Sequence, residues 1–270
     1  FFTMMYYTFM LKYCQAGAFL LGFFVSIIGG LVGLGGAEFR LPFLIKLFGF
    51  APLEAVIINK ATSLVVVSSS LVSRTAVIPF SEMMKNLPVA LNLLTGSILG
   101  AWLAADWATK VRAKVLQRVM AVVLLFIAIV LVLERSFPLL RLDLPGLILY
   151  PVGALAGFLI GVVVALLGVA GGELLIPTIT LLYQLDVKLA GSMSLLVSLP
   201  TMLFAFARYS MDRSFLVLRE KVRFMLFMVF GSLLGSFLGG SLLLEVIPQE
   251  GILMLLVLIL LISSYKLWKH

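Results

Sequence analysis

Residues 33–42 read GLGGAEFRLP, and residues 168–177 read GVAGGELLIP. Every residue of the second stretch lies 135 positions after its counterpart in the first, which is half of the 270-residue chain. Each copy is a glycine cluster followed by a carboxylate and a proline, set in apolar sequence. Chance matching of apolar residues would not align glycine, glutamate and proline together. The chain is therefore predicted to be an internal duplication, with repeats at residues 1–135 and 136–270.

The composition predicts a membrane protein. Hydrophobic residues make up 63% of the chain and charged residues only 12%, whereas a soluble domain carries about 25% charged residues. Apolar runs near the spanning length recur along the chain, and they suit helices better than the alternating strands of a barrel. The net charge of +8 is interpreted as loop cations that set topology, not as a nucleic-acid surface.

The apolar runs predict four helical segments and a short one in each half. The glycine cluster follows the first run of each half, and the segment after it is too short to span a membrane alone. The predicted segments are residues 16–32, 38–47, 53–74, 87–107 and 115–133, and then 146–167, 173–183, 187–209, 222–244 and 251–268. The fold class is therefore an all-α polytopic protein in which each repeat has a broken or re-entrant helix hairpin plus three transmembrane helices.

The duplication continues outside the core motif. Gly22-Phe23 matches Gly157-Phe158 at the same offset. A second glycine pattern matches as well, Gly96, Ser97 and Gly100 with Gly231, Ser232 and Gly235. Small residues at this spacing allow close helix packing in membranes, so these patches are given a structural role.

Positive charges concentrate in one loop of each half, and these loops are not equivalent under the repeat. The cations are Lys110, Arg112, Lys114 and Arg118 in the first half, and Arg208, Arg213, Arg219, Lys221 and Arg223 in the second. Arg74 and Lys85 are assigned to the opposite, sparsely charged loop of the first half. Because lysine and arginine mark cytoplasmic loops, the halves are expected to be inverted, with both termini in the cytoplasm.

The paired motif predicts an anion site. Inverted repeats with interrupted hydrophobic segments at matching positions are typical of secondary transporters, whose substrates bind at the interruption. A short helix that starts at such a break directs its positive dipole end and its free N–H groups at the cavity. The expected backbone contributors are Gly33, Gly35, Gly36, Gly168, Gly171 and Gly172.

Glu38 and Glu173 lie in the first turn of the two short segments. One interpretation is that they cap free N–H groups, as acidic residues often do there. The other is proton coupling, because a buried carboxyl group favours its neutral form and can bind and release a proton. Protonation would also relieve the repulsion between a carboxylate and an anionic ligand.

Polar side chains on the following helices complete the expected site. Asn59 and Ser63 lie four residues apart, as do their counterparts Ser194 and Ser198, so each pair shares a helix face. They are expected to donate to the anion or, alternatively, to bond between helices. Lys60 and Arg208 are alternative positive partners for the anion, but they are rather expected to extend to the membrane interface, because they fall near predicted helix ends. For Arg40 the sequence leaves open whether it neutralises Glu38 or contacts substrate.

These motifs resemble those of the sulfite exporter TauE/SafE family, also called 4-toluene sulfonate uptake permeases. The resemblance covers nearly the whole chain and rests on Gly33, Gly36 and Pro42, with Gly168, Gly171, Gly172 and Pro177 in the second copy. Many members carry an apolar residue where Glu38 and Glu173 stand. The resemblance implies transport of sulfite or small organosulfonates across the cytoplasmic membrane of bacteria.

The residues predict a secondary transporter of a small anion that works by alternating access, and the resemblance implies that the anion is a sulfur oxyanion. Export is the expected direction. The alternatives are an anion channel and a proton-coupled uptake permease for another small organic anion. An enzyme is not expected, because the only histidine is His270 and the only cysteine is Cys14. No metal, cofactor or nucleic acid is expected; the expected partners are the anion and membrane lipid, and a homodimer is left open.

Overall fold

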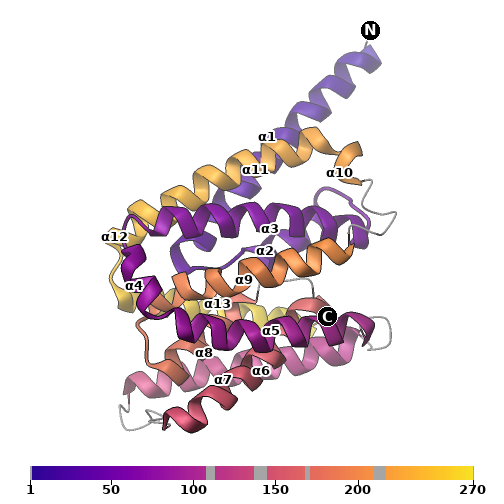
Figure 1. Cartoon of the computed structure of the whole chain (residues 1–270). Helices are drawn as coiled ribbons and strands as arrows, with labels where there is room; N and C mark the ends of the chain where they lie inside the picture. Colours follow the sequence, from indigo (N-terminus) through magenta and orange to yellow (C-terminus); the bar gives the residue numbers. More distant parts are fainter. Residues whose placement is uncertain (1, 108–112, 137–144, 168–170, 210–216, 270) are drawn as a thin grey trace.

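The computed structural model of this chain is helical throughout the part that it describes, residues 2–107, 113–136, 145–167, 171–209 and 217–269 (Figure 1). The first half contains α1 (Phe2–Val32), α2 (Ala37–Lys46), α3 (Pro52–Arg74), α4 (Phe80–Lys85), α5 (Leu87–Trp107) and α6 (Ala113–Ser136). The second contains α7 (Gly146–Leu167), α8 (Gly172–Tyr183), α9 (Val187–Tyr209), α10 (Val217–Glu220), α11 (Val222–Phe237), the π-helical η3 (Leu238–Leu243), α12 (Leu244–Val246) and α13 (Gln249–Lys269).

The predicted helices agree closely with these bounds. Helices α5, α7 and α9 begin and end at the predicted residues, and the two short segments appear as α2 and α8. Helix α1 extends back to Phe2, although only residues 16–32 were predicted as helix. The predicted helix 222–244 is interrupted by η3, whose sequence LGGSLL has two adjacent glycines that permit the local rewinding.

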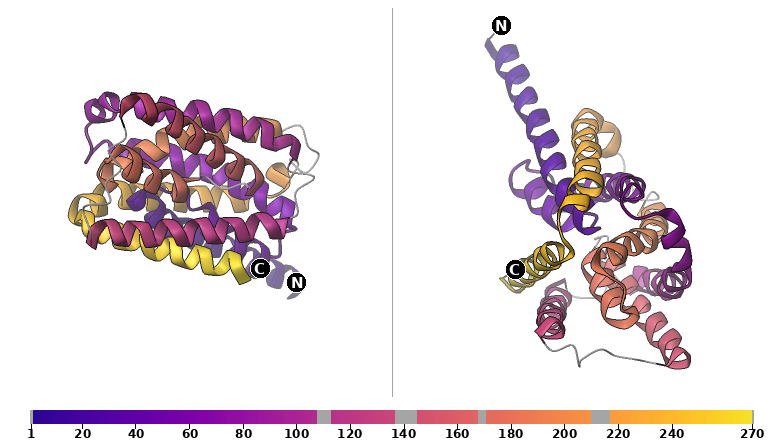
Figure 2. Two further views of the ribbon diagram at one scale, coloured as in Figure 1. Left: turned by 90° about the horizontal axis from the view of Figure 1, so that it is seen from below. Right: turned by 90° about the vertical axis from the view of Figure 1, so that its left-hand side faces the viewer.

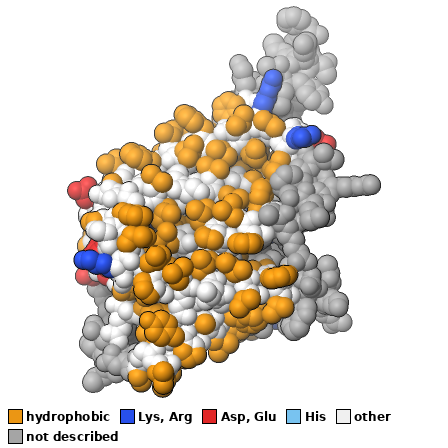
Figure 3. All heavy atoms as spheres, in the orientation of Figure 1, with side chains coloured by type: hydrophobic (Ala, Val, Ile, Leu, Met, Phe, Trp, Pro, Cys, Tyr) orange, Lys and Arg blue, Asp and Glu red, His pale blue; other side chains and the backbone are white. Residues whose placement is uncertain are grey.

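Six described helices are long and apolar enough to cross a membrane. Large hydrophobic side chains cover the outside, among them Leu147, which is 90% exposed. The face drawn in Figure 3 is mostly hydrophobic, and its charged side chains lie toward the two ends of the helices. This distribution is typical of a multi-pass membrane protein, whose lipid-facing surface is apolar between two polar ends.

Helix α3 carries several polar residues in an otherwise apolar sequence. Most of them face inward, and Asn59, Ser63 and Arg74 are among the buried ones. Polar groups at membrane depth are costly unless they lie inside the bundle, where they mark functional sites. The inward polar face of α3 therefore indicates that a functional site lies at the protein centre.

The two most closely packed helix pairs each combine one helix of the first half with one helix of the second. Helix α1 packs along α11, and its repeat counterpart α7 packs along α5, the counterpart of α11 (Figures 1 and 2). In both pairs a Cβ atom added to a glycine would collide with a carbonyl oxygen of the partner helix. These contacts are Gly96 with Ala154, Gly100 with Phe158, Gly231 with Phe19 and Gly235 with Phe23. The predicted packing role of the two glycine patches is therefore confirmed.

Helices α3 and α9, which are repeat counterparts, cross at the centre in opposite directions. Arg74 at the end of α3 bonds to Ser192 near the start of α9, while Leu64 and Leu199 from the helix middles line one groove. The start of α1 and the end of α13 lie at one end of the bundle, where α10 is also found (Figure 1). The ends of α3 and of η3 lie at the opposite end.

Candidate functional site

The first break separates α1 from α2. Its glycines adopt backbone conformations that other residues avoid, with φ of 96° at Gly33 and 66° at Gly36. Gly36 is the residue that caps the start of α2, and it is left-handed. Because L-residues with a Cβ atom are strained in this region, glycine is required to turn the chain from α1 into the short helix.

The second short helix begins in the same way. Gly171 caps the start of α8 with φ of 76° and ψ of 1°, close to the 66° and 12° of its repeat counterpart Gly36. Gly172 is the first residue of α8. The predicted Gly168 lies outside the described residues. Glycine-capped short helices therefore follow both breaks, as predicted.

The first break lies against the second half. Ser194 of α9 donates a hydrogen bond from Oγ to the carbonyl oxygen of Gly33 at 2.8 Å. A Cβ atom on Gly33 would collide with the backbone of Gly191, and one on Gly172 would lie 3.1 Å from the Gly33 oxygen. The break after α1 and the start of α8 are thus in direct contact at the protein centre.

A buried cation lies beside the first break. Arg40 in the first turns of α2 is 0% exposed. Its Nη2 donates to the carbonyl oxygen of Gly35 at 2.8 Å and to Oγ of Ser63 at 2.5 Å, and its Nε donates to Oδ1 of Asn59 at 3.2 Å. These partners hold a positive charge at the glycine cluster, on the side where the N-terminus of α2 also favours an anion.

Asn59 and Ser63, predicted to share one face of α3, are brought together around Arg40. Asn59 also donates from Nδ2 to the carbonyl oxygen of Ala37 at 2.8 Å, which ties α3 to the first residue of α2. Both side chains therefore position Arg40 and the helix start in this conformation. The sequence did not reveal this, because the bonds join residues 19 to 23 positions apart.

In the second half, the predicted serines differ from each other. Ser194 uses its hydroxyl proton within the protein, on the carbonyl oxygens of Gly33 and Gly191. Ser198, one turn further along α9, is 2% exposed, and its Oγ has no hydrogen-bond partner among the described residues. A buried hydroxyl without a partner is uncommon and indicates a group that is available to a ligand or water.

Glu173, a carboxylate predicted for the site, is buried, 4% exposed in the first turn of α8. Ser263 of α13 donates from Oγ to its Oε1 at 2.9 Å. Ser263 was not identified from the sequence, although a tandem serine pair in the apolar run of α13 is a signal for inward polar contacts. The adjacent Ser264 bonds instead to the Ala121 carbonyl oxygen of α6. The side chain of Glu38 lies outside the described residues.

Two expectations for cations are wrong. Lys60 was expected at the membrane interface but is buried, 4% exposed, on the inner face of α3. Arg74, assigned to a loop, is fully buried at the end of α3. Arg74 can be buried because hydrogen-bond acceptors surround its guanidinium group inside the protein. These acceptors cannot be recognised from the sequence alone. The side chain of Arg208 lies outside the described residues.

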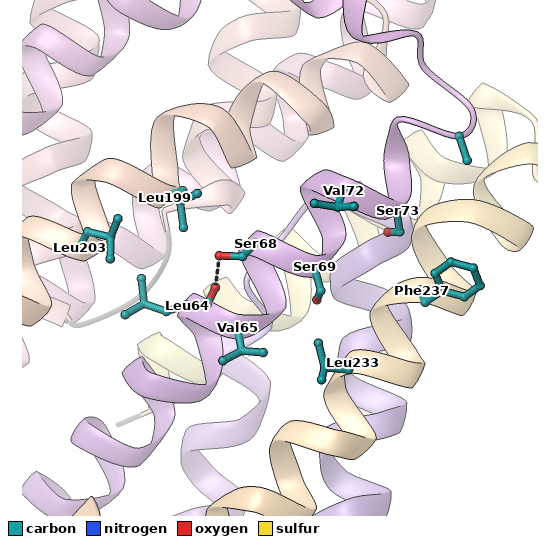
Figure 4. Close-up of a pocket in the computed structure, with 11 residues that line it drawn as sticks. Leu64, Val65, Ser68, Ser69, Val72, Ser73, Leu199, Leu203, Leu233 and Phe237 are labelled. Atoms are coloured by element: carbon teal, nitrogen blue, oxygen red, sulfur yellow. Dashed lines mark hydrogen bonds between the residues drawn. The ribbon is translucent and has the colours of Figure 1, made fainter.

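A groove of about 830 Å³ opens on the other face of α3, between α9 and α11 (Figure 4). Its lining is mainly aliphatic, and its serines bond within the protein: Ser68 donates to the Leu64 carbonyl oxygen, and Ser69 bonds to Ser236. No lining residue is charged. The groove therefore lacks the groups that bind a small anion, and the glycine breaks remain the candidate site.

A helical bundle with six candidate spans in its described part, in which two short helices each begin at a left-handed glycine, has the architecture of a polytopic membrane protein. The family model "Sulfite exporter TauE/SafE" matches residues 18–267. The chain therefore belongs to the sulfite exporter TauE/SafE family, whose members are membrane transporters of sulfur anions, and the predicted resemblance is confirmed. Searches of curated proteins and of solved structures found no match.

Proposed function

We propose that this protein is a secondary transporter that exports sulfite or a small organosulfonate by alternating access. The observation that carries the proposal is the contact between the start of α8 and the first glycine break, at which Arg40 is held by the Gly35 carbonyl oxygen. The substrate class follows from the family match over residues 18–267. The apolar surface supports a membrane location, and we propose that this is the cytoplasmic membrane, with both termini in the cytoplasm.

The anion would bind between the starts of α2 and α8. Both helices begin at a left-handed glycine, and the first N–H groups of a helix have no acceptor within it. Arg40 supplies the positive charge, and Ser198 supplies a buried hydroxyl that has no partner in the described part of the chain. A sulfur oxyanion has several acceptor oxygens for such donors, so the site is suited to it.

Inverted repeats at residues 1–135 and 136–270 would provide the alternating motion. Two observations support inversion: α3 and its counterpart α9 run in opposite directions, and the pairs α1–α11 and α7–α5 repeat each other's glycine contacts. In known inverted-repeat carriers one half rocks against the other around a fixed site. An inside-negative membrane would drive a monovalent anion outward by about 2.3 kcal/mol per 100 mV.

Glu173 is proposed to carry the coupled proton. Glu173→Gln keeps the acceptor oxygen for Ser263 but removes the titrating group, so we expect folding to persist and the pH dependence of transport to disappear. The measurement is the initial rate of organosulfonate flux between external pH 5.5 and 8, because a sulfonate keeps its charge over this range whereas sulfite takes up a proton. Glu250→Gln, an exposed change at the start of α13, is the control. If the Glu173→Gln variant transports at a normal rate and keeps the wild-type pH dependence, Glu173 has only a structural role.

Flux of radiolabelled sulfite in proteoliposomes tests the proposed substrate. Sulfite and sulfoacetate should compete for transport, and acetate should not, because only the sulfur oxyanions fill a site built from several donors. If acetate is transported saturably and sulfur anions do not compete with it, the protein is still a carrier but the proposed substrate class is wrong.

A further inference from the structure

Arg74, the last residue of α3, is fully buried and lies outside the proposed anion site. Its Nη1 donates to the carbonyl oxygens of Gly30 and Leu31 in the last turn of α1, both at 2.8 Å. Its Nε donates to Oγ of Ser192 at 2.9 Å, and its Nη2 donates to the carbonyl oxygen of Lys188. One guanidinium therefore joins the end of α1 to the start of α9.

The surrounding backbone is built to admit this side chain. A Cβ atom on Gly191 would lie 2.6 Å from Nη2 of Arg74, and one on Gly240 would collide with Ser73 and lie 3.3 Å from Cγ of Arg74. Gly240 belongs to η3, and short π-helical segments are frequent at functional sites. The close approach of three helices and η3 at Arg74 therefore depends on glycine at two positions.

This connection lies at one end of the bundle. Helices α1 and α3 come from the first half and α9 from the second, and they meet at the end away from the chain termini (Figure 1). The position equivalent to Arg74 in the second repeat is Tyr209, and the position equivalent to Ser192 in the first is Ile57. The repeat-related positions at the opposite end therefore carry neither the arginine nor its serine acceptor.

We propose that Arg74 is a latch that closes the transport pathway at the end of the bundle opposite the termini. The inference rests on the proposed alternating access, in which that end must open in part of the cycle. Opening separates α1 from α9, so the guanidinium must leave the carbonyl oxygens of one helix. Because the two ends are unequal, the latch also sets the population of the state that is closed here.

Ser194 provides a reporter directly behind the latch. It is fully buried and bonds to the carbonyl oxygens of Gly191 and Gly33. A cysteine at this position, in a Cys14→Ser background, should be protected from a membrane-impermeant maleimide while the latch is closed. Labelling from the side opposite the termini therefore measures opening without using any substrate.

Arg74→Gln should raise the labelling rate of Ser194→Cys from that side about tenfold, by shifting the population toward the open state. Arg74→Lys should raise it less, because lysine keeps the charge but lacks the fork that joins two helices. Thr75→Ala is the matched control: Thr75 is the next residue, is exposed, and its hydroxyl donates to the Val72 carbonyl oxygen of α3. Its labelling should equal that of the parent.

The latch is rejected if Arg74→Gln labels at the parent rate, or if labelling rises equally from both sides, which would indicate general loosening. If Arg74→Gln does not fold, Ser192→Ala removes one acceptor and should raise labelling in the same direction; an unchanged rate in this variant also rejects the proposal. If the wild type does not transport sulfite, the proposed substrate is wrong, but the labelling experiment still tests the latch.

Discussion

Replacing Gly33 with alanine is expected to abolish sulfite transport. Gly33 has φ of 96°, and a Cβ atom there would collide with the backbone of Gly191 in the other half. Left-handed strain alone costs about 1–3 kcal/mol, and backbone cannot move aside as a flexible side chain can. The break must therefore shift away from α9, which separates the two short helices. We expect a fall of at least about 100-fold in flux, equivalent to about 2.7 kcal/mol.

Gly49→Ala is the matched control for this change. Gly49 also has a positive φ, 69°, but a Cβ atom there has no neighbour within 4 Å. The control therefore contains the backbone strain without the collision, and its transport rate should stay within a few-fold of the wild type. Equal losses in both variants would show that strain alone, and not the contact between the halves, explains the effect of Gly33→Ala.

Arg40→Leu is expected to have the second large effect. The change removes the donor from the Gly35 carbonyl oxygen, from Asn59 and from Ser63, and it removes the positive charge that we place beside the anion. Leucine suits a short helix at this position, since the counterpart of Arg40 is the buried Leu175. We expect transport to fall about 100-fold or more, as for loss of a charged partner in a buried site.

Measuring KM and the maximal transport rate separately distinguishes a role of Arg40 in substrate binding from a structural role. Arg40→Lys keeps the charge and should raise KM for sulfite while retaining measurable transport. Arg219→Leu, at an exposed position of α10, should leave KM unchanged and controls for loss of positive charge in general. A wild-type KM in Arg40→Leu would contradict the placement of Arg40 at the anion.

Much of the fold was predictable because its signals are local. Apolar runs of spanning length gave the bounds of α5, α7 and α9, and the repeated glycines located both breaks. Gly36 and Gly171 illustrate why: a left-handed cap accepts glycine best, so the requirement is visible in the sequence. Shorter elements such as α4 and α10 were missed, since six or four residues produce no spanning signal.

The surroundings of the buried cations were not predictable. Nothing near Arg74 in the chain indicates that its acceptors are Gly30, Leu31 and Lys188, the last of them 114 residues away. Likewise, Ser263 lies 90 residues from Glu173. Such contacts depend on which helices pack together, and the exchange of α1 and α7 between the halves becomes evident only in three dimensions.

Counterflow in proteoliposomes tests the central claim most directly, because it requires both a sulfur anion and an alternating carrier. Vesicles loaded with unlabelled sulfite are diluted into medium with a trace of radiolabelled sulfite, with no membrane potential. We predict transient accumulation of label above its external concentration, absent with acetate-loaded vesicles and lost in Gly33→Ala. Label that only equilibrates would indicate a channel, and no sulfite movement at all would contradict the proposed function.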